Sequence, residues 1–254
     1  MHAIGQQIIR LEEAASTNTL VLGRTEYLET PGLVVLARHQ TGGRGRMGRQ
    51  WVSLPGRQLQ FSVVLHPRMP VGDLPAVALV AGLAVAQAIR GMLPLKPQLK
   101  WPNDVLVAER KVCGILVEGQ PGPRNAPRLV VGIGINCNGA AEDFPPELRE
   151  RLTTLAAQAG QEVAPDPLLE ATLRALEAGL NRLEQGDKPG LLADWRAWAL
   201  LGAARRVRVP THTGGVPGVA EGYAEDITAE GYLLVRLPDG TRVTQVSGEL
   251  DWLG

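Results

Sequence analysis

The sequence predicts an α+β protein, in which a mixed β-sheet packed with helices precedes a small β-barrel. Up to about Gly202, apolar runs typical of buried strands occur together with grouped helical patterns. Beyond Gly202, short strands separated by Gly-Gly, Glu-Gly and Asp-Gly turns predict an all-β module of about fifty residues. We therefore expect two domains, at residues 1–202 and 203–254.

The first part of the chain predicts two helices among three strands. Ser16, Thr17 and Asn18 open a helix to about Arg24, because their side chains can accept hydrogen bonds from the first unpaired N–H groups. Asp73 is expected to cap a long, almost wholly apolar helix from Leu74 to about Arg90. The expected strands are Ile8–Glu12, Leu33–Ala37 and Leu59–Leu65.

The rest of the chain predicts a hairpin, a further strand, three helices and the C-terminal strands. The hairpin consists of two extended runs with a short connection, Gln98–Val107 and Lys111–Glu118. The next strand is Leu129–Asn136, and the helices are Pro146–Ala159, Asp166–Gln185 and Leu191–Leu201. The C-terminal strands are Arg205–Pro210, Val216–Ile227, Tyr232–Leu237 and Thr241–Val246.

Composition narrows the classes of function. With 26 basic and 26 acidic residues, the chain has no overall field that would attract nucleic acid or an anionic membrane. It shows neither a signal peptide nor an apolar run long enough to cross a membrane. Cys113 and Cys137 lie apart in apolar settings, so a disulfide framework and a zinc site are not expected. These features predict a cytoplasmic protein.

An unusual basic stretch runs from Arg38 to Trp51 and holds four arginines, four glycines and no acid. Such a segment is costly to order, and arginine forks and open glycine backbone suit an anionic ligand. The alternative is a solvated basic turn. The letters from Gly43 to Gly48 also match a dinucleotide fingerprint, but Pro55 and Gly56 follow where that motif needs a helix.

Two further stretches break the rules of regular strands. In the run from Lys100 to Val105, Pro102 interrupts a strand, and the resulting kink could direct Asn103 and Asp104 towards a common site. A bulged or edge strand explains the proline equally well. The run from Gly132 to Asn136 puts two glycines inside a strand, which fits either a bound ligand or close packing against a helix.

These stretches occur in a distinctive order: Ser-Thr-Asn, Gly-Arg-Gly-Arg-x-Gly-Arg-x-Trp, Lys-Trp-Pro-Asn-Asp, Lys-x-x-Gly-Ile-Leu-Val-Glu and Gly-Ile-Gly-Ile-Asn. In this order they resemble the biotin–protein ligases, from about Ser16 to Asn138. A weaker resemblance to the small SH3-like domain of that family covers Gly222, Asp239-Gly240 and Ser247-Gly248-Glu249. The resemblance implies a ligase that makes biotinyl-5'-AMP from biotin and ATP with Mg²⁺. Biotin then passes to a lysine of a biotin carboxyl carrier protein.

The resemblance also implies roles for individual residues. Lys111, Arg44, Arg46 and Asp104 would be catalytic. The biotin site would comprise Ser16, Thr17, Asn18, Gln40, Gly43, Arg44, Arg46, Lys111, Gly114, Gly132 and Gly134. The nucleotide site would comprise Arg46, Arg49, Trp51, Asn103, Asp104, Lys111 and Asn136.

Several points stay open at the level of sequence. Asp104 would either help to hold Mg²⁺ or accept a proton from the attacking lysine. Only fifteen residues precede Ser16, so we expect no DNA-binding domain and no repressor role. Pairing of two subunits through an exposed strand is compatible with the sequence. The alternative functions are a lipoate–protein ligase and a non-catalytic nucleic-acid-binding protein.

Overall fold

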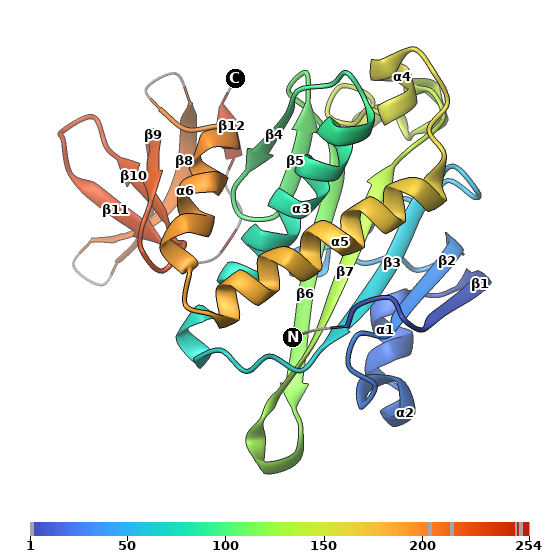
Figure 1. Cartoon of the computed structure of the whole chain (residues 1–254). Coiled ribbons are helices and arrows are strands. Elements are labelled where there is room, and N and C mark those ends of the chain that lie inside the picture. Colours follow the sequence, from blue (N-terminus) through green and yellow to red (C-terminus); the bar gives the residue numbers. More distant parts are fainter. Residues whose placement is uncertain (1–2, 203–204, 214–215, 247, 249–250, 254) are drawn as a thin grey trace.

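The computed structural model describes residues 3–202, 205–213, 216–246, 248 and 251–253. Ser247 and Glu249, named above for the C-terminal module, lie outside the described residues. The main body is a seven-stranded mixed sheet in the order β1-β2-β3-β7-β6-β5-β4 (Figure 1). β1 and β2 are parallel, and the other neighbours are antiparallel. The strands are β1 (Ile8–Ala14), β2 (Val34–Gln40), β3 (Gln58–Leu65), β4 (Pro97–Lys100), β5 (Asp104–Val107), β6 (Arg110–Pro121) and β7 (Pro127–Asn136).

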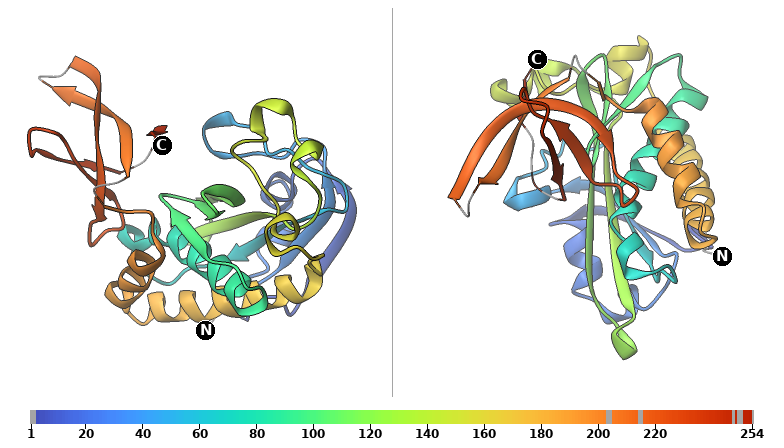
Figure 2. Two further views of the ribbon diagram at one scale, coloured as in Figure 1. Left: turned by 90° about the horizontal axis from the view of Figure 1, so that it is seen from above. Right: turned by 90° about the vertical axis from the view of Figure 1, so that its left-hand side faces the viewer.

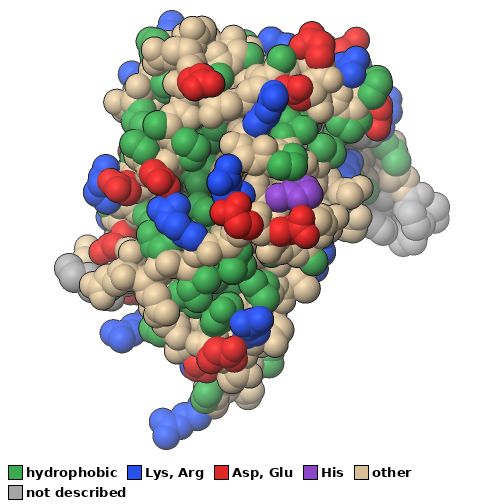
Figure 3. Space-filling view, turned by 90° about the vertical axis from the view of Figure 1, so that its right-hand side faces the viewer, with side chains coloured by type: hydrophobic (Ala, Val, Ile, Leu, Met, Phe, Trp, Pro, Cys, Tyr) green, Lys and Arg blue, Asp and Glu red, His purple; other side chains and the backbone are tan. Residues whose placement is uncertain are grey.

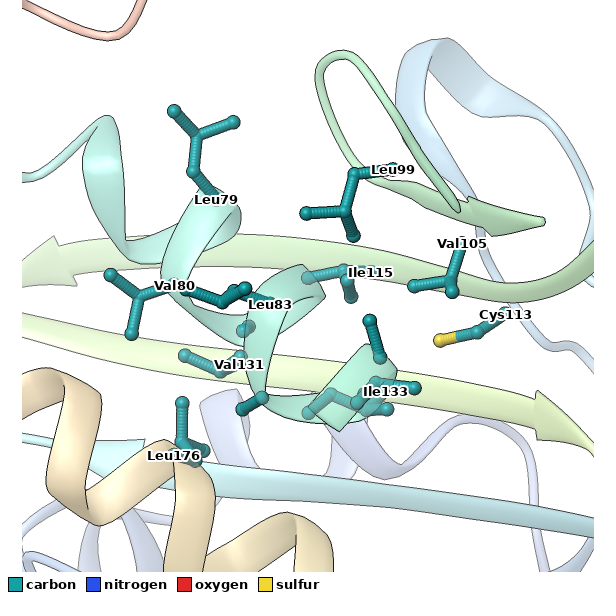
Figure 4. Close-up of a cluster of buried hydrophobic side chains, with 14 of the residues drawn as sticks. Leu79, Val80, Leu83, Leu99, Val105, Cys113, Ile115, Val131, Ile133 and Leu176 are labelled. Carbon is teal, nitrogen blue, oxygen red and sulfur yellow. The ribbon is translucent and has the colours of Figure 1, made fainter. Parts of the chain in front are cut away.

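One face of this sheet forms the main core. Along β3, Leu59, Phe61 and Val63 alternate with polar side chains, because successive residues of a strand point to opposite faces. The apolar face packs against α3 (Ala76–Met92) and α5 (Pro165–Glu184), which lie together on one side of the sheet (Figure 2). Figure 4 shows this core where side chains of α3, such as Leu83, meet Ile115 and Ile133.

The other face of the sheet is covered only at one end. There α1 (Thr17–Leu22) and α2 (Thr25–Leu28) bury a small second cluster around Val21, Val35 and Val130. Among the described residues, α3 makes the main helix contacts with β6 and β5, and it packs on the opposite, apolar face. The uncovered part is where the polar stretches of the sequence meet. The side of the molecule next to β1 carries interspersed basic and acidic side chains (Figure 3).

The C-terminal module is a five-stranded antiparallel sheet in the order β11-β10-β9-β8-β12. It follows α6 (Lys188–Trp198), and its strands are β8 (Arg206–Thr213), β9 (Val216–Ile227), β10 (Leu233–Arg236), β11 (Arg242–Gln245) and β12 (Asp251–Leu253). β12 was not expected from the sequence. The module is tied to the main body, since Nε1 of buried Trp101 donates to the Gly231 carbonyl at 3.0 Å and Arg196 pairs with Asp226 at 2.6 Å.

Three expectations about elements were wrong. Asp73 does not cap α3, because its carboxylate pairs with Lys188 Nζ at 2.6 Å and the helix begins after Pro75 without a side-chain cap. The extended run Gln98–Val107 is two antiparallel strands, β4 and β5, separated by a turn that includes the cis bond between Trp101 and Pro102.

The third concerns the helix expected over Pro146–Ala159. Only α4 (Leu155–Ala159) is helical, after a single 3-10 turn at Pro146–Leu148. Between them, Leu152 forms an isolated bridge with Lys111, and Thr153 N–H donates to the Lys111 carbonyl at 3.0 Å. Pairing with the start of β6 therefore replaces the helix. No helix among the described residues is long and apolar enough to span a membrane.

We expect both thiols to be unreactive in the folded protein. Cys113 and Cys137 are free and fully buried, and burial raises the pKa of both thiols, that of Cys137 to about 12. An exposed thiol ionises at about pH 8.5. Above that pH the unfolded state loses thiol protons that the folded state keeps, so the free energy of unfolding should fall as the pH rises towards the folded pKa. Titration with a thiol reagent at pH 8 should detect both cysteines in denaturant and neither without it. Reaction of either thiol in the native protein would contradict the buried geometry.

Candidate active site

The strand registers bring five residues into one row across the uncovered face of the sheet. Residues directly opposite each other in neighbouring strands point to the same face. The paired residues, in order from β3 through β7, β6 and β5 to β4, are Gln60, Gly134, Gly114, Asp104 and Lys100. The row therefore has an amide at one end, two bare backbone positions in the middle, and an acid and a base at the sheet edge.

The indole of Trp51 lies against the two glycines in the middle of this row. A Cβ atom built on Gly134 would lie 2.6 Å from Cζ2 of Trp51, and one on Gly114 would lie 3.1 Å from Cζ3. Lys111 Nζ lies 5.8 Å from the centre of the indole, within range of a cation–π contact. The buried Nε1 of Trp51 has no hydrogen-bond partner among the described residues.

This arrangement changes the interpretation of the strand glycines. From the sequence, Gly114, Gly132 and Gly134 were expected to leave room for a ligand. In the structure the room is taken by protein side chains, since a Cβ on Gly132 would lie 2.5 Å from Oδ1 of Asn18. The glycines therefore let Trp51 and Asn18 approach the sheet.

The basic stretch forms a compact loop over the row. Trp51 N–H donates to the Gly43 carbonyl at 2.9 Å, and a 3-10 turn at Arg46–Gly48 forms the tip, where Met47 has a φ of 53°. The arginine ends reach the sheet: Arg44 pairs with Glu118 at 2.7 Å, and Arg46 Nη1 donates to Asn103 Oδ1 at 3.3 Å. The sequence predicted that an anionic ligand pairs with the arginines of the loop. In the structure, the Glu118 carboxylate pairs with one of them, Arg44.

Asp104 lies at the centre of a group of cations. Its Oδ1 is 2.7 Å from Lys111 Nζ, and both side chains are mostly buried. Burial lowers the pKa of Arg46, and the charge of Asp104 partly offsets this. Burial also lowers the pKa of Lys100, where Asp104 opposes the shift and the charges of other cations add to it. The site is therefore a cationic, partly desolvated surface that favours an anion beside Asp104.

Comparisons with known proteins show the family of this chain. Residues 12–136 match the biotin/lipoate A/B protein ligase family, and residues 205–251 match the biotin protein ligase C terminal domain. The biotin--[acetyl-CoA-carboxylase] ligase of Mycobacterium tuberculosis is 35% identical over 250 residues, which cover 95% of this chain and 87% of that protein. The chain belongs to the biotin/lipoate A/B protein ligase family.

Other members of the biotin/lipoate ligase family are similar over most of the chain. The bifunctional ligase/repressor BirA of Bacillus spizizenii is 32% identical over 240 residues, 94% of this chain and 72% of that protein. A structure of the biotin protein ligase of Aquifex aeolicus in complex with biotin and ATP superposes with a TM-score of 0.82 at 28% identity. That match covers 98% of this chain and 99% of the other, so the fold of the family extends through the C-terminal module.

A buried polar network extends the ligase site towards α1. Thr17 N–H donates to Gln40 Oε1 at 2.8 Å, and Gln40 Nε2 donates to Gln60 Oε1 at 2.9 Å. Ser62 Oγ lies 2.6 Å from Asn18 Oδ1. Ser16, in contrast, caps α1 with an Oγ that accepts from Thr19 N–H at 3.4 Å. The network fixes amide and hydroxyl groups at the inner end of the row.

Asn136 lies two residue pairs beyond the row and is 1% exposed. Its Oδ1 accepts from Gln58 Nε2 at 2.8 Å, and its Nδ2 donates to the Thr153 carbonyl at 3.1 Å. The Asn136 amide therefore lies inside the protein, whereas the side chains of Asp104, Lys111 and Trp51 lie together at the row. The Asn136 amide holds the segment after β7 against β3.

Residues that the sequence reasoning missed complete the site: Gln60, Ser62, Lys100 and Glu118. Glu118 links the loop to α1, because its Oε2 accepts from both Arg44 and Asn18, at 2.7 and 2.9 Å. The alternation of polar and apolar residues along Gln58–Leu65 indicated the first two. Glu118 ends one of the motifs, but its contacts could not be predicted, since its partners are 74 and 100 residues away.

We expect Glu118→Gln to loosen the arginine loop. Arg44 would lose a charged partner, but the Arg44 side chain is 43% exposed, so the loss is roughly 1 kcal/mol and tryptic cleavage in the loop should accelerate about fivefold. Limited proteolysis with product identification at Arg44 and Arg46 measures this. Glu170→Gln is the matched control, because the Glu170 side chain is exposed on α5 and also pairs with an arginine; it should leave the cleavage rate unchanged. Equal rates in both variants would contradict a loop held by Glu118.

Proposed function

We propose that this chain is a biotin–protein ligase, which joins biotin to ATP and then transfers the biotin to a lysine of a biotin carboxyl carrier protein. One observation carries the proposal: cationic side chains from separate segments converge beside Trp51 on a glycine surface. This arrangement occurs in a chain 35% identical to a protein named biotin--[acetyl-CoA-carboxylase] ligase. The arrangement suits the meeting of two anions, a carboxylate and a polyphosphate.

In the first step, the biotin carboxylate attacks the α-phosphorus of ATP, and pyrophosphate leaves. Lys111 contacts both groups and offsets their repulsion. Its pairing with Asp104 supports this role, because it holds Nζ at the middle of the row. Arg46 approaches from the loop, and Arg44 serves the carboxylate end of biotin, next to Glu118. Charge that is already fixed in a partly dry site needs little reorganisation when the transition state forms.

The polar network near α1 holds the ring end of biotin. A cyclic urea has one acceptor oxygen and two N–H donors, and the hydroxyl and amide groups of Thr17, Asn18 and Gln40 can meet both kinds. Ser16 contributes by starting α1 where Thr17 and Asn18 face the sheet. The glycines of the site contribute indirectly, because they leave space for the side chains that pack against them. These glycines are Gly43, Gly114, Gly132 and Gly134.

The nucleotide lies on the other side of the row. Trp51 offers an indole face to adenine, Arg49 and Asn103 lie at the phosphate side, and Asn136 supports the floor from within. Among the described residues, no group of three or more His, Cys, Asp or Glu side chains is placed to hold a metal ion. Mg²⁺ therefore fits best as an ion held mainly by the phosphates of ATP, with Asp104 as the protein ligand.

In the second step, the lysine amine of the carrier attacks the acyl carbon, and AMP leaves. The amine must lose a proton, and Asp104 is the carboxylate of the row. Its partner Lys111 then stays to neutralise the leaving phosphate. The arginine loop, which contacts Glu118 and Asn103 through Arg44 and Arg46, excludes water from the mixed anhydride between the two steps.

Calorimetry tests the proposal. Biotin should bind the wild-type protein, and adding ATP with Mg²⁺ should convert the complex to a much tighter one. Lipoate and octanoate, titrated in the same way, are the controls for acyl selectivity. A protein that gives no heat with biotin but binds lipoate would move the assignment to the other branch of the family. Lack of binding to all three acids would contradict an acyl-ligase function.

A further inference from the structure

A relay of hydrogen bonds runs from the start of α1 to the end of the arginine loop. Thr17 N–H donates to Gln40 Oε1 at 2.8 Å, and Gln40 Nε2 donates to Gln60 Oε1 at 2.9 Å. Gln60 Nε2 then donates to Ser53 Oγ at 2.8 Å, and the Gln40 backbone N–H donates to the same oxygen at 3.0 Å. Gln40, Gln60 and Ser53 therefore form a closed ring of hydrogen bonds at the base of the loop.

The direction of every bond in this relay is fixed from one end. A backbone N–H can only donate, so the atom of Gln40 that faces Thr17 N–H must be the amide oxygen. Gln40 then presents its amide nitrogen to Gln60, and Gln60 presents its own nitrogen to Ser53. The orientation of both amides thus depends on the Ser53 hydroxyl oxygen, which accepts from two donors.

Gln60 depends on this acceptor because it is buried. Its side chain is 0% exposed, so bulk water does not reach a donor that loses its partner. Without the Ser53 hydroxyl, Gln60 Nε2 would be a buried donor with no acceptor in that direction. Turning the Gln60 amide over would set its nitrogen against that of Gln40, so that two donors face each other. Both outcomes disturb the amide of Gln40.

The main chain on either side of Ser53 is held by other contacts. Leu54 N–H donates to Gln58 Oε1 at 2.8 Å, and Gln58 Nε2 donates to the Val52 carbonyl at 3.1 Å. The Trp51 N–H, just before this segment, donates to the Gly43 carbonyl. Loss of the Ser53 hydroxyl should therefore leave the loop in place and act on the two amides.

We propose that Ser53 is a positioning residue for biotin, which acts through Gln60 to fix the amide of Gln40 in the orientation that binds the ring of biotin. The inference rests on the proposed function, in which Gln40 contacts that ring. It adds a residue that lies at the far end of the relay from Thr17. The arginine loop thereby has a second role, because its last residues support the ring end of biotin while its arginines serve the carboxylate end.

Calorimetric titration of the full chain with biotin, without nucleotide, measures this role. Ser53→Ala should weaken biotin binding by about tenfold, since a buried donor loses its partner and the Gln40 amide loses its fixed orientation. Ser53→Thr keeps the hydroxyl oxygen and should stay within about threefold of the wild type. Ser53→Cys is similar in size but offers a weak acceptor, so it should resemble Ser53→Ala. The KM for ATP at saturating biotin should stay within about threefold in all three variants.

A double-mutant cycle separates positioning from a merely structural role. Gln60→Met removes the buried amide and breaks the relay before Ser53. Adding Ser53→Ala in that background should weaken biotin binding by less than about twofold, because its effect passes through Gln60. A structural role of Ser53 in the loop would give the same loss in both backgrounds.

Thr228→Ala is the matched control, because the Thr228 hydroxyl also accepts from two N–H groups, those of Glu230 and Tyr232, but lies in the C-terminal module. It should bind biotin as the wild type does. Biotin affinity of Ser53→Ala within about twofold of the wild type would overturn the inference, as would equal losses in the two backgrounds of the cycle. If Ser53→Ala does not fold, the comparison of Ser53→Cys with Ser53→Thr decides the result. A wild-type protein that does not bind biotin would instead contradict the proposed function, so the two failures are distinguishable.

Discussion

Replacing Lys111 by methionine should reduce biotin-dependent ATP–pyrophosphate exchange by about 10² to 10³-fold, the usual effect of removing one preorganised donor from a transition state. Methionine keeps the unbranched shape of the side chain and its contact with Trp51 but removes the charge. Asp104 then faces the incoming carboxylate and phosphate without its partner at 2.7 Å, so repulsion adds to the loss. The exchange rate at saturating ATP and biotin is the measurement.

A double-mutant cycle separates these two contributions. Asp104→Asn should reduce the exchange rate less in the Lys111→Met background than in the wild type, because the coupling between the two paired charges is lost only once. Lys96→Met is the matched control and should exchange at the wild-type rate. Exchange by Lys111→Met within about threefold of the wild type would exclude Lys111 from the chemical step.

The sequence predicted most strands because their apolar runs are local signals. Leu59–Leu65 and Leu129–Asn136 were right to within two residues at each end, since burial fixes which positions must be apolar. The predicted fold class, a mixed sheet followed by a small all-β module, also agrees with the fold. The SH3-like interpretation came from a family resemblance, which the match at residues 205–251 confirms at the level of the C-terminal domain.

The errors arose where distant partners overrode a local pattern. Asp73 has the position of a helix cap, but Lys188 lies within reach 115 residues later. The run after Pro146 has a helical pattern, yet pairing of Leu152 with Lys111 provides its backbone with other partners. Lys100 and Glu118 lie at the ends of two motifs, but their place in the site was missed for the same reason, since only the strand register shows that they share a face with Gly114.

The strand glycines show what a motif leaves out. Their spacing indicated a close approach to the backbone, which the structure confirms, but the approaching group at Gly134 is Trp51. Arg38–Trp51 and Gly132–Asn136 are thus one unit, although about eighty residues separate them. The loop and the sheet form the nucleotide surface only together.

Gly134→Ala should therefore act on the nucleotide and leave biotin largely unaffected. The new methyl group would meet Cζ2 of Trp51 at 2.6 Å, closer than carbon atoms approach, so the indole must move. Because Trp51 belongs to a loop, it can swing outward, and the free energy of unfolding should fall by only about 1 kcal/mol. The lost adenine stacking is worth about 1–3 kcal/mol, so the KM for ATP should rise roughly tenfold to a hundredfold.

Two comparisons make the Gly134→Ala result specific to the Trp51 contact. Gly91→Ala is the matched control, because a Cβ at Gly91 would meet no atom within 4 Å, and its KM for ATP should equal that of the wild type. Combining Gly134→Ala with Trp51→Phe gives the ring more room, so the double variant should lose less than the sum of the single effects. Strict additivity would mean that Gly134 and Trp51 act separately and that the glycine serves the ligand directly.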